Sequence, residues 1–288
     1  MITSSRQLMD RIKNLVGSDS AKAQTAMRLY AMERFLDRLA RSPWRGRFIV
    51  KGGALVTALV GVSMRTTMDI DATVEGITLQ EDEIIRVVEE ICMIETDDGM
   101  DFHVKSVDRI MDEHDYPGIR LSMEALLDRA RIPMKLDFST DDPITPGAIE
   151  LGYPRLLEDG EIPIMAYNLE TLLTEKLETI ISRGVANTRM RDFYDIFVLL
   201  EVKGDSIEPH TLKAAIRATF AKRGTDSSPE NARLILSELE DDERMREMWF
   251  RYQSKSDYAR DVTWEDAMRA ASRLIDALAG GRDDSPGD

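Results

Sequence analysis

The stretch RTTMDID, residues 65–71, decides the fold expected for this chain. Its surroundings predict a β-strand, and alternate residues of a strand lie on one face. Asp69 and Asp71 therefore point the same way, with Thr67 and Arg65 behind them. Two carboxylates so placed repel each other unless a cation lies between them, and Mg²⁺ prefers oxygen ligands. For such a pair alone, a solvated acidic strand face is the commoner explanation.

A glycine turn precedes this strand by one short helix. Residues 48–50 are predicted as a strand and residues 54–60 as a buried helix, with Lys51, Gly52 and Gly53 between them. Glycines allow backbone N–H groups to approach a phosphate closely, and a helix N-terminus favours anions. A Gly-Gly pair is usually only a turn, but the combination with the acidic strand is more specific.

A third carboxylate lies on another predicted strand. In residues 131–139 apolar side chains alternate with polar ones, which places Lys135 and Asp137 on the polar face. Asp137 could join Asp69 and Asp71, either as a metal ligand or as a base for an attacking hydroxyl. A charged, solvated strand face is an equally good explanation of Asp137 taken alone.

A predicted helix over residues 168–184 carries Lys176 and Arg183. These residues lie two turns apart on one helix face. Together they could bind a triphosphate, with lysine acting as a point charge and arginine as a two-pronged donor. An ordinary amphipathic helix explains the same pattern without a ligand.

The next predicted helix, over residues 190–202, begins with the acidic and basic pattern RMRDFYD. Arg191 and Asp195 are four residues apart and could simply form an ion pair on the helix surface. Asp192 lies near Asp195 on the same helix. The intrahelical ion pair accounts for Arg191 and Asp195 without a ligand.

The remaining pattern predicts an α+β protein with a nucleotidyltransferase-like order of elements. A mixed β-sheet core flanked by helices is expected over residues 1–160, and an α-helical half over residues 161–288 with a disordered acidic tail from residue 280. Beyond the elements already given, the pattern predicts helices over 20–40, 80–94, 209–221, 228–239 and 262–279, and strands over 102–108 and 118–127.

Composition excludes several classes of protein. The 288 residues carry a net charge of −15 and are 43% hydrophobic, which disfavours both a disordered chain and a nucleic-acid binder that relies on bulk charge. A phosphate-bearing substrate would need a local basic mouth, for which the candidates are Lys51, Arg65, Lys135, Lys176, Arg183, Arg189 and Arg191.

The chain's one cysteine and three scattered histidines exclude an intramolecular disulfide framework and a zinc site. No apolar run is long enough to span a membrane, and the first residues lack the pattern of a secretory signal. A cytoplasmic protein is expected.

The order of these motifs resembles that of the AbiEii/AbiGii-type toxins, a family of the polymerase β-like nucleotidyltransferase superfamily. The resemblance covers residues 20–202: the glycine pair, then R-x-T-x-D-I-D, K-x-D, E-K-L…R and R-D-x-Y-D. The first motifs are shared by the superfamily, and the last two indicate this family. The chain departs from the superfamily in two ways, with Gly-Gly in place of the frequent Gly-Ser and a long spacing from Gly53 to Asp69.

The resemblance implies a role for each motif. It assigns nucleotide binding to two groups of residues. The first half of the chain supplies Gly52, Gly53, Arg65 and Thr67, and the second half supplies Lys176, Arg183, Arg191 and Asp192. Mg²⁺ would be held by Asp69, Asp71 and Asp137. The catalytic set would be Asp69, Asp71, Asp137, Lys176 and Asp195.

The resemblance also implies an activity. A toxin of this type would transfer NMP from an NTP to an acceptor hydroxyl, expected to be the 3′ end of tRNA, and thereby block translation. A cognate antitoxin would be its protein partner. Two alternatives remain open at this point: a small-molecule (antibiotic-type) nucleotidyltransferase of the same fold, and a non-catalytic nucleotide-binding or interaction module.

Overall fold

The computed structural model describes residues 2–110 and 118–279, and the chain divides into two compact units. The sheet unit comprises Met1–Ala58, Thr66–Asp142 and Ala148–Tyr167, and the helical unit comprises Leu59–Arg65, Pro143–Gly147 and Asn168–Asp288. The motif R-x-T-x-D-I-D therefore starts in the helical unit with Arg65 and continues in the sheet unit. The tail expected to be disordered, residues 280–288, lies outside the described residues.

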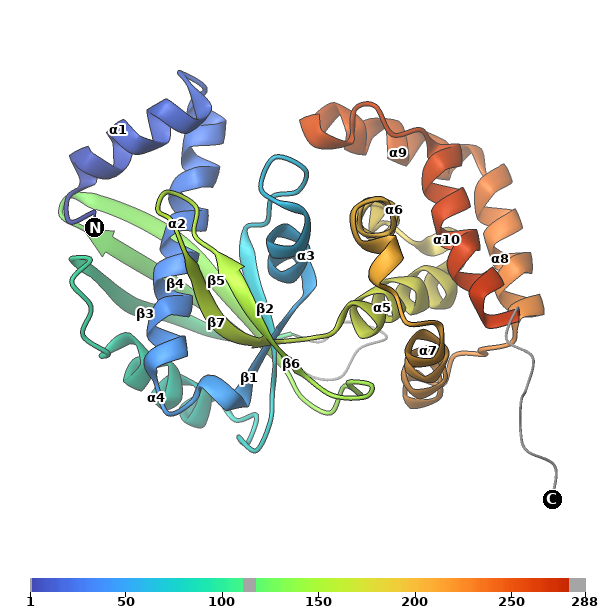
Figure 1. Cartoon of the computed structure of the whole chain (residues 1–288), viewed down its shortest axis with the longest axis horizontal. Coiled ribbons are helices and arrows are strands. Elements are labelled where there is room, and N and C mark those ends of the chain that lie inside the picture. The colour runs from blue at the N-terminus through green and yellow to red at the C-terminus, as the bar shows by residue number, and fades with distance from the viewer. Residues whose placement is uncertain (1, 111–117, 280–288) are drawn as a thin grey trace. The chain divides into compact units, whose positions relative to one another are not determined.

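The sheet unit is built on seven strands in the order β3-β4-β5-β2-β1-β7-β6 (Figure 1). The strands are β1 (Phe48–Lys51), β2 (Asp69–Val74), β3 (Met100–Ile110), β4 (Gly118–Leu127), β5 (Ala130–Ser139), β6 (Ile149–Pro154) and β7 (Glu161–Ala166). The pairs β2–β5 and β1–β7 are parallel and the other pairs are antiparallel. The predicted mixed sheet is confirmed, whereas β6 and β7 were not predicted.

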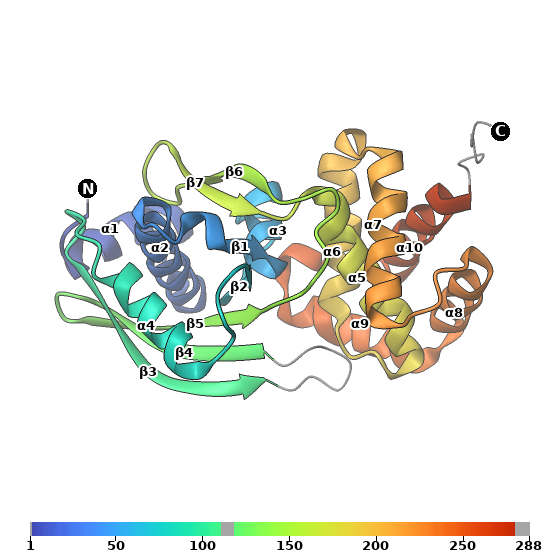
Figure 2. The same ribbon diagram turned by 90° about the horizontal axis from the view of Figure 1, so that it is seen from below.

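Helices α1 (Ser5–Val16), α2 (Ser20–Arg41) and α4 (Glu81–Cys92) belong to the sheet unit, and α3 (Gly52–Val60) begins there. Asp19 caps α2 by accepting hydrogen bonds from the N–H groups of its first turn. The apolar face of α2 packs against β5 and β7, while α4 packs against β3 and both α1 and α4 contact α2 (Figures 1 and 2). Helix α1 was not predicted, although Leu8 and Ile12 bury one helical face.

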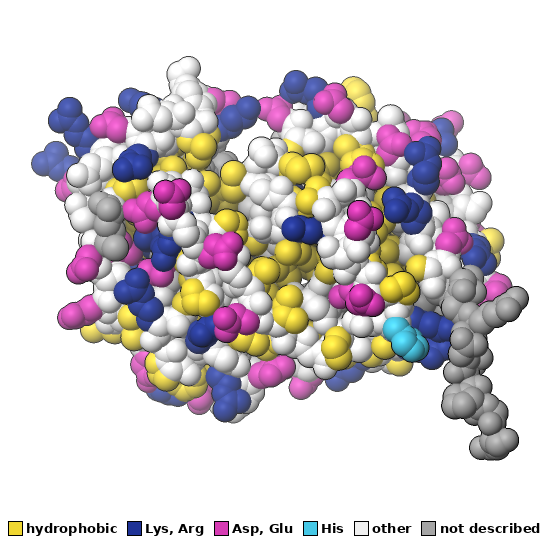
Figure 3. Space-filling model, in the orientation of Figure 1, with side chains coloured by type: hydrophobic (Ala, Val, Ile, Leu, Met, Phe, Trp, Pro, Cys, Tyr) yellow, Lys and Arg dark blue, Asp and Glu magenta, His cyan; other side chains and the backbone are white. Residues whose placement is uncertain are grey.

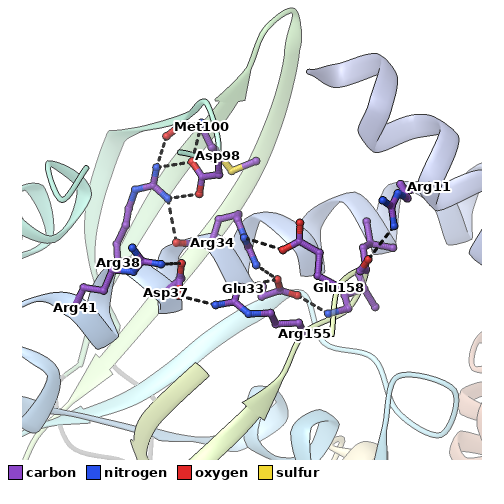
Figure 4. Close-up of polar contacts among 12 residues, drawn as sticks. Arg11, Glu33, Arg34, Asp37, Arg38, Arg41, Asp98, Met100, Arg155 and Glu158 are labelled. Atoms are coloured by element: carbon purple, nitrogen blue, oxygen red, sulfur yellow. Dashed lines mark hydrogen bonds and ion pairs between the residues drawn. The ribbon is translucent and has the colours of Figure 1, made fainter. Parts of the chain in front are cut away.

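An ionic network on α2 joins distant parts of the sheet unit (Figure 4). Arg155, at the start of the β6–β7 connection, donates to Asp37 at 2.9 Å, and the Leu156 N–H donates to Glu33 at 2.6 Å. On the other side of α2, Arg38 forms a bidentate pair with Asp98, at 2.8 and 2.9 Å. These bonds fix the β6–β7 hairpin and the chain before β3 onto the same helix.

The helical unit contains α5 (Leu169–Arg183), α6 (Met190–Lys203), α7 (Pro209–Arg223), α8 (Pro229–Asp241), α9 (Glu243–Lys255) and α10 (Trp264–Ala279). Helix α5 lies beside α6 and α7 (Figure 2), and α10 packs on α6 and α8. Aromatic side chains fill the space between α6, α9 and α10, with Phe193 and Trp249 each contacting Trp264. All of these helices except α9 were predicted, each within a few residues of its observed bounds.

None of the helices in the described ranges 2–110 and 118–279 has the length and apolar character that crossing a membrane requires.

Candidate functional site

The turn from β1 to α3 is shaped around one carboxylate. Gly52 has φ +59°, a conformation that side chains rarely adopt, and a Cβ at this position would lie 2.2 Å from Asp71 Oδ2. The Gly53 N–H donates a hydrogen bond to the same oxygen at 3.2 Å. The glycine pair therefore allows the turn to approach the Asp71 carboxylate and to bind it.

Four neighbouring strands place charged residues in one row. In the register of the sheet, Arg120 of β4 lies opposite Asp137 of β5, Asp137 opposite Asp71 of β2, and Asp71 opposite Lys51 of β1. Residues opposite each other on adjacent strands share a face of the sheet. Asp69, two residues before Asp71, lies on that face beside Lys135. The structure thus brings together the three carboxylates that the sequence analysis grouped.

Each end of this row is closed by a cation. Arg120 donates through Nε and Nη2 to Asp137 Oδ1 and Oδ2, at 2.8 and 2.6 Å. Lys51 Nζ lies 2.6 Å from Asp142 Oδ2 and 5.4 Å from the ring centroid of Tyr167. Asp142 thereby holds the Lys51 ammonium at the β1 end of the row. The three acidic residues Asp69, Asp71 and Asp137 are called the carboxylate row below.

The pKa of Asp71 is raised, which means that its surroundings disfavour the charged carboxylate. Burial raises its pKa, and the nearby Asp137 raises it further, by more than Lys51 and the Gly53 N–H lower it. The result is a pKa of about 6, against an ordinary value of 3.8. A carboxylate in this environment is stabilised by any cation that binds beside it.

The carboxylate row fits a divalent-cation site that substrate oxygens complete, and not one built from protein ligands alone. Within the described part of the chain, no group of three or more histidine, cysteine or acidic residues is arranged to hold a metal ion by itself. Arg120 engages both oxygens of Asp137, so Asp69 and Asp71 are the carboxylates of the row that Arg120 does not bind in this way. Mg²⁺ usually takes only one or two protein carboxylates together with substrate phosphates, and a pair of carboxylates fits that pattern.

The later motifs form a second cluster, inside the helical unit. Lys176 Nζ of α5 donates to Asp195 Oδ2 at 2.7 Å and to Asp192 Oδ1 at 3.2 Å, both on α6. Arg65 Nε donates to Asp195 Oδ1 at 2.6 Å. The Arg65 and Asp195 side chains are only 4% and 0% exposed, so these charges compensate one another away from water.

The pKa shifts in this cluster express that compensation. Burial alone would raise the pKa of Asp195, but Lys176 and Arg65 outweigh burial and lower it. Burial would lower the pKa of Lys176, but Asp195 and Asp192 raise it. All three groups therefore stay charged, and the cluster holds α5, α6 and the segment that leads toward β2 in one arrangement. Phosphate binding by Lys176 stays a prediction.

The other candidate residues lie at less enclosed positions. Thr67 is buried and donates from Oγ1 to the backbone carbonyl of Asp69 at 3.2 Å, so it supports the start of β2. Arg183 is the last residue of α5 and is partly exposed, and Arg191 is exposed in the first turn of α6. The intrahelical pair considered for Arg191 and Asp195 is not formed, because Asp195 is directed to Arg65 and Lys176.

On the face in view, neither unit shows a broad basic surface (Figure 3). Acidic and basic side chains alternate there (Figure 3). At least four of the seven basic residues proposed to line the local basic mouth have carboxylate partners: Lys51, Arg65, Lys176 and Arg189. The mouth itself stays a prediction.

Sequence reasoning missed Arg120 and Asp142. Arg120 lies on the polar face of the predicted strand 118–127, which was the available signal. Its pairing with Asp137 depends on the register of β4 against β5, and register is a tertiary property. Asp142 follows β5 in a segment that the sequence indicated only as a proline-rich turn.

Comparisons with known proteins identify the family and the fold. A family model described as "Nucleotidyl transferase AbiEii toxin, Type IV TA system" matches residues 34–270. The fold is similar to MenT4, a nucleotidyltransferase toxin from Mycobacterium tuberculosis, with a TM-score of 0.57, 16% identity, and coverage of 96% of this chain and 98% of that one. It is also similar to JHP933 from Helicobacter pylori, with a TM-score of 0.51, 13% identity, and coverage of 88% and 91%. No curated protein sequence matches the chain.

Proposed function

Because the chain belongs to the AbiEii nucleotidyltransferase toxin family, we propose that it transfers NMP from an NTP to an acceptor hydroxyl with the carboxylates of β2 and β5. The observation that carries this proposal is the row of Asp71 and Asp137 beside Asp69, next to a glycine turn that binds Asp71. The raised pKa of Asp71 supports it, because burial and the neighbouring Asp137 disfavour the charged carboxylate, and a bound cation would stabilise it.

In the proposed reaction, Asp69 and Asp71 hold a divalent cation, for which we propose Mg²⁺. When bound, this ion neutralises the phosphate oxygens and lowers the pKa of the acceptor hydroxyl. Asp137 accepts the hydroxyl proton as the acceptor oxygen bonds to the α-phosphorus. The bond from that phosphorus to the β-phosphate oxygen breaks, and pyrophosphate leaves.

The glycine turn contributes by its position. Gly52 allows the backbone to lie against Asp71, and the Gly53 N–H donates to the carboxylate and orients it. We also propose the family roles for the helical unit, in which Lys176 and Arg183 bind phosphate and Arg191, Asp192 and Asp195 shape their surroundings. The ion pairs of Lys176 with Asp192 and Asp195 fix the position of its ammonium within the helical unit.

For the acceptor we propose an RNA 3′ end, with tRNA as the first candidate, so that toxicity follows from blocked translation. The partner proposed for neutralisation is a cognate antitoxin. The net charge of −15 disfavours binding of a long duplex by bulk charge and is compatible with a short acceptor end.

The deciding experiment incubates the protein with Mg²⁺, each α-³²P-labelled NTP in turn, total bacterial RNA, total bacterial protein and a set of small hydroxyl-bearing acceptors of the antibiotic type. We expect label in small RNA with one or more of the NTPs, and none with Asp69→Asn. Asp101→Asn, which changes an exposed carboxylate on β3, serves as the matched control and should label as the wild type does. Label only in an added small acceptor would identify the antibiotic-type alternative, and no label in any acceptor would favour the non-catalytic module.

A further inference from the structure

Arg120 has no role in the reaction described so far. Its guanidinium engages both oxygens of Asp137, at 2.8 and 2.6 Å, in the two-pronged geometry that also suits a phosphate group. The carboxylate proposed to accept the proton is therefore already bound by a cation of the protein itself.

Arg120 interacts with the whole carboxylate group. Its pKa is raised first by the hydrogen bond to Asp137, and the charges of Asp69 and Asp71 raise it further. In the absence of a metal ion, Arg120 thus supplies positive charge that the row requires. A divalent cation bound beside Asp71 would compete with it, because two cations at one carboxylate group repel each other.

The Arg120–Asp137 pair is also less enclosed by neighbouring atoms than a buried ion pair. The Arg120 side chain is 37% exposed and that of Asp137 is 17% exposed. Water therefore reaches the guanidinium and can replace part of what it loses on leaving Asp137, which is not so for the enclosed pair of Arg38 with Asp98. A long arginine side chain at this position can turn to a new anion without a change in the backbone.

We propose that Arg120 is an exchangeable counter-ion, which binds Asp137 in the free protein and turns to the phosphates of the NTP when the metal–nucleotide complex binds. This inference rests on the proposed function, since it assigns Arg120 a place in that reaction. The exchange frees Asp137 for the proton of the acceptor hydroxyl at the moment when substrate is present. Arg120 is then both a positioning residue for Asp137 and a phosphate ligand.

The exchange predicts two shifts of opposite sign for Arg120→Gln. Mn²⁺ alone should bind more tightly than to the wild type, by roughly 10-fold, because a competing cation is gone. The complex of Mn²⁺ with a nucleotide should bind less tightly, by roughly 10-fold, because a bidentate phosphate ligand is lost. If Arg120 had only a structural role, the substitution would weaken both affinities or leave both unchanged.

Isothermal titration calorimetry measures both affinities on the intact chain. One titration uses Mn²⁺ alone, and the other uses Mn²⁺ with the α,β-methylene analogue of each of the four NTPs, which cannot react. Arg131→Gln is the matched control: it removes the same charge from β5, where Arg131 pairs with Glu124 of β4 at 2.9 Å. It should leave both affinities unchanged, and circular dichroism should show native folding for both variants.

Opposite shifts in Arg120→Gln alone would support the exchange. Unchanged or weaker binding of Mn²⁺, or unchanged binding of every Mn²⁺–nucleotide complex, would overturn it. Neither titration requires transfer, so the inference can fail while the wild type still labels RNA. Conversely, the opposite shifts can be present in a chain that labels no acceptor, in which case the proposed function fails and the binding role of Arg120 remains.

Discussion

Two bidentate arginine–aspartate pairs of the sheet unit differ in their exposure to water and in the charges around them. Arg38 and Asp98 are 3% and 1% exposed, and Arg38 donates in addition to the carbonyls of Arg34 and Met100 (Figure 4). Arg120 and Asp137 are 37% and 17% exposed and face two further carboxylates. The first pair is enclosed and held by additional hydrogen bonds, whereas the second is partly exposed and has anionic neighbours.

The pKa shifts of the two regions show what this difference means. Burial would raise the pKa of Asp98, but the hydrogen bonds from Arg38 and from the Met100 N–H outweigh burial and lower it. In the carboxylate row, burial and Asp137 together raise the pKa of Asp71 to about 6. A carboxylate whose charge is fully compensated supports the fold, and one left short of compensation is available for a ligand.

The largest effect is expected from breaking the enclosed pair. Arg38→Ala leaves Asp98 buried without its partner, which should lower the free energy of unfolding by about 3–5 kcal/mol at pH 7. Because the folded-state pKa of Asp98 is lowered, the stability from this pair is present above the ordinary aspartate pKa and is lost as pH falls through the folded value. The difference between wild type and variant in urea unfolding should therefore shrink in acid.

Arg41→Ala is the control for this prediction. Arg41 pairs with Asp37 on the same helix, but its side chain is 50% exposed, so a loss of under about 1 kcal/mol is expected. Equal losses for Arg38→Ala and Arg41→Ala would show that enclosure does not distinguish these pairs.

Next in size is the effect of a methyl group in the glycine turn. Gly52→Ala forces a left-handed residue, at about 1–2 kcal/mol, and drives a Cβ into the Asp71 carboxylate, for a total loss of about 2–4 kcal/mol in chemical unfolding. Gly224→Ala, at a left-handed position with φ +70° and open space around it, isolates the backbone contribution. In an Asp71→Ala background the cost of Gly52→Ala should fall toward that of Gly224→Ala. An undiminished cost would mean that the turn is not shaped around Asp71.

A smaller gain in stability is expected from removing the uncompensated charge. Asp71→Asn keeps an acceptor for the Gly53 N–H and removes one of the mutually repelling carboxylates. In metal-free buffer at pH 7 the free energy of unfolding should rise by about 1–2 kcal/mol. Asp98→Asn should do the opposite, since it breaks a compensated pair. Loss of stability in Asp71→Asn would place Asp71 with Asp98 as a structural residue.

The smallest effect on stability is expected at the open pair itself. Arg120→Ala should change the free energy of unfolding by less than about 1 kcal/mol, because a partly exposed pair contributes little. Thermal unfolding of the metal-free protein measures this directly. A loss as large as that of Arg38→Ala would mean that the Arg120–Asp137 pair is structural and not exchangeable.

Local pattern was sufficient to predict that the carboxylates of β2 share one face of their strand. Strand alternation placed Asp69 with Asp71 and put Asp137 on the polar face of its strand, and the structure brings the three together. The pairing of Arg120 with Asp137 could not be predicted, because it depends on which residue of β4 lies opposite β5. The same holds for Arg65 and Asp195, which are 130 residues apart in the chain.

Helix α1 was missed although its buried Leu8 and Ile12 lie one turn apart, whereas the other elements that were not predicted have weak local signals. Gly152 and Pro154 in β6 and Pro163 in β7 are residues that normally argue against strands, and pairing within the sheet overrides them. Helix α9 buries only Met245 and Trp249 and is the most polar of these helices, so it offers few apolar residues from which to recognise a helix. These elements are specified by tertiary packing more than by local preference.

The most direct test of the central claim is a titration of label transfer with Mg²⁺, comparing the wild type with Asp71→Asn at equal amounts of folded protein. The account predicts no transfer in the presence of EDTA, recovery on addition of Mg²⁺, and a rate for Asp71→Asn lower by at least about 100-fold at every Mg²⁺ concentration. Transfer by the stable Asp71→Asn variant at the wild-type rate would contradict it, because the carboxylate row would then not be where the reaction occurs.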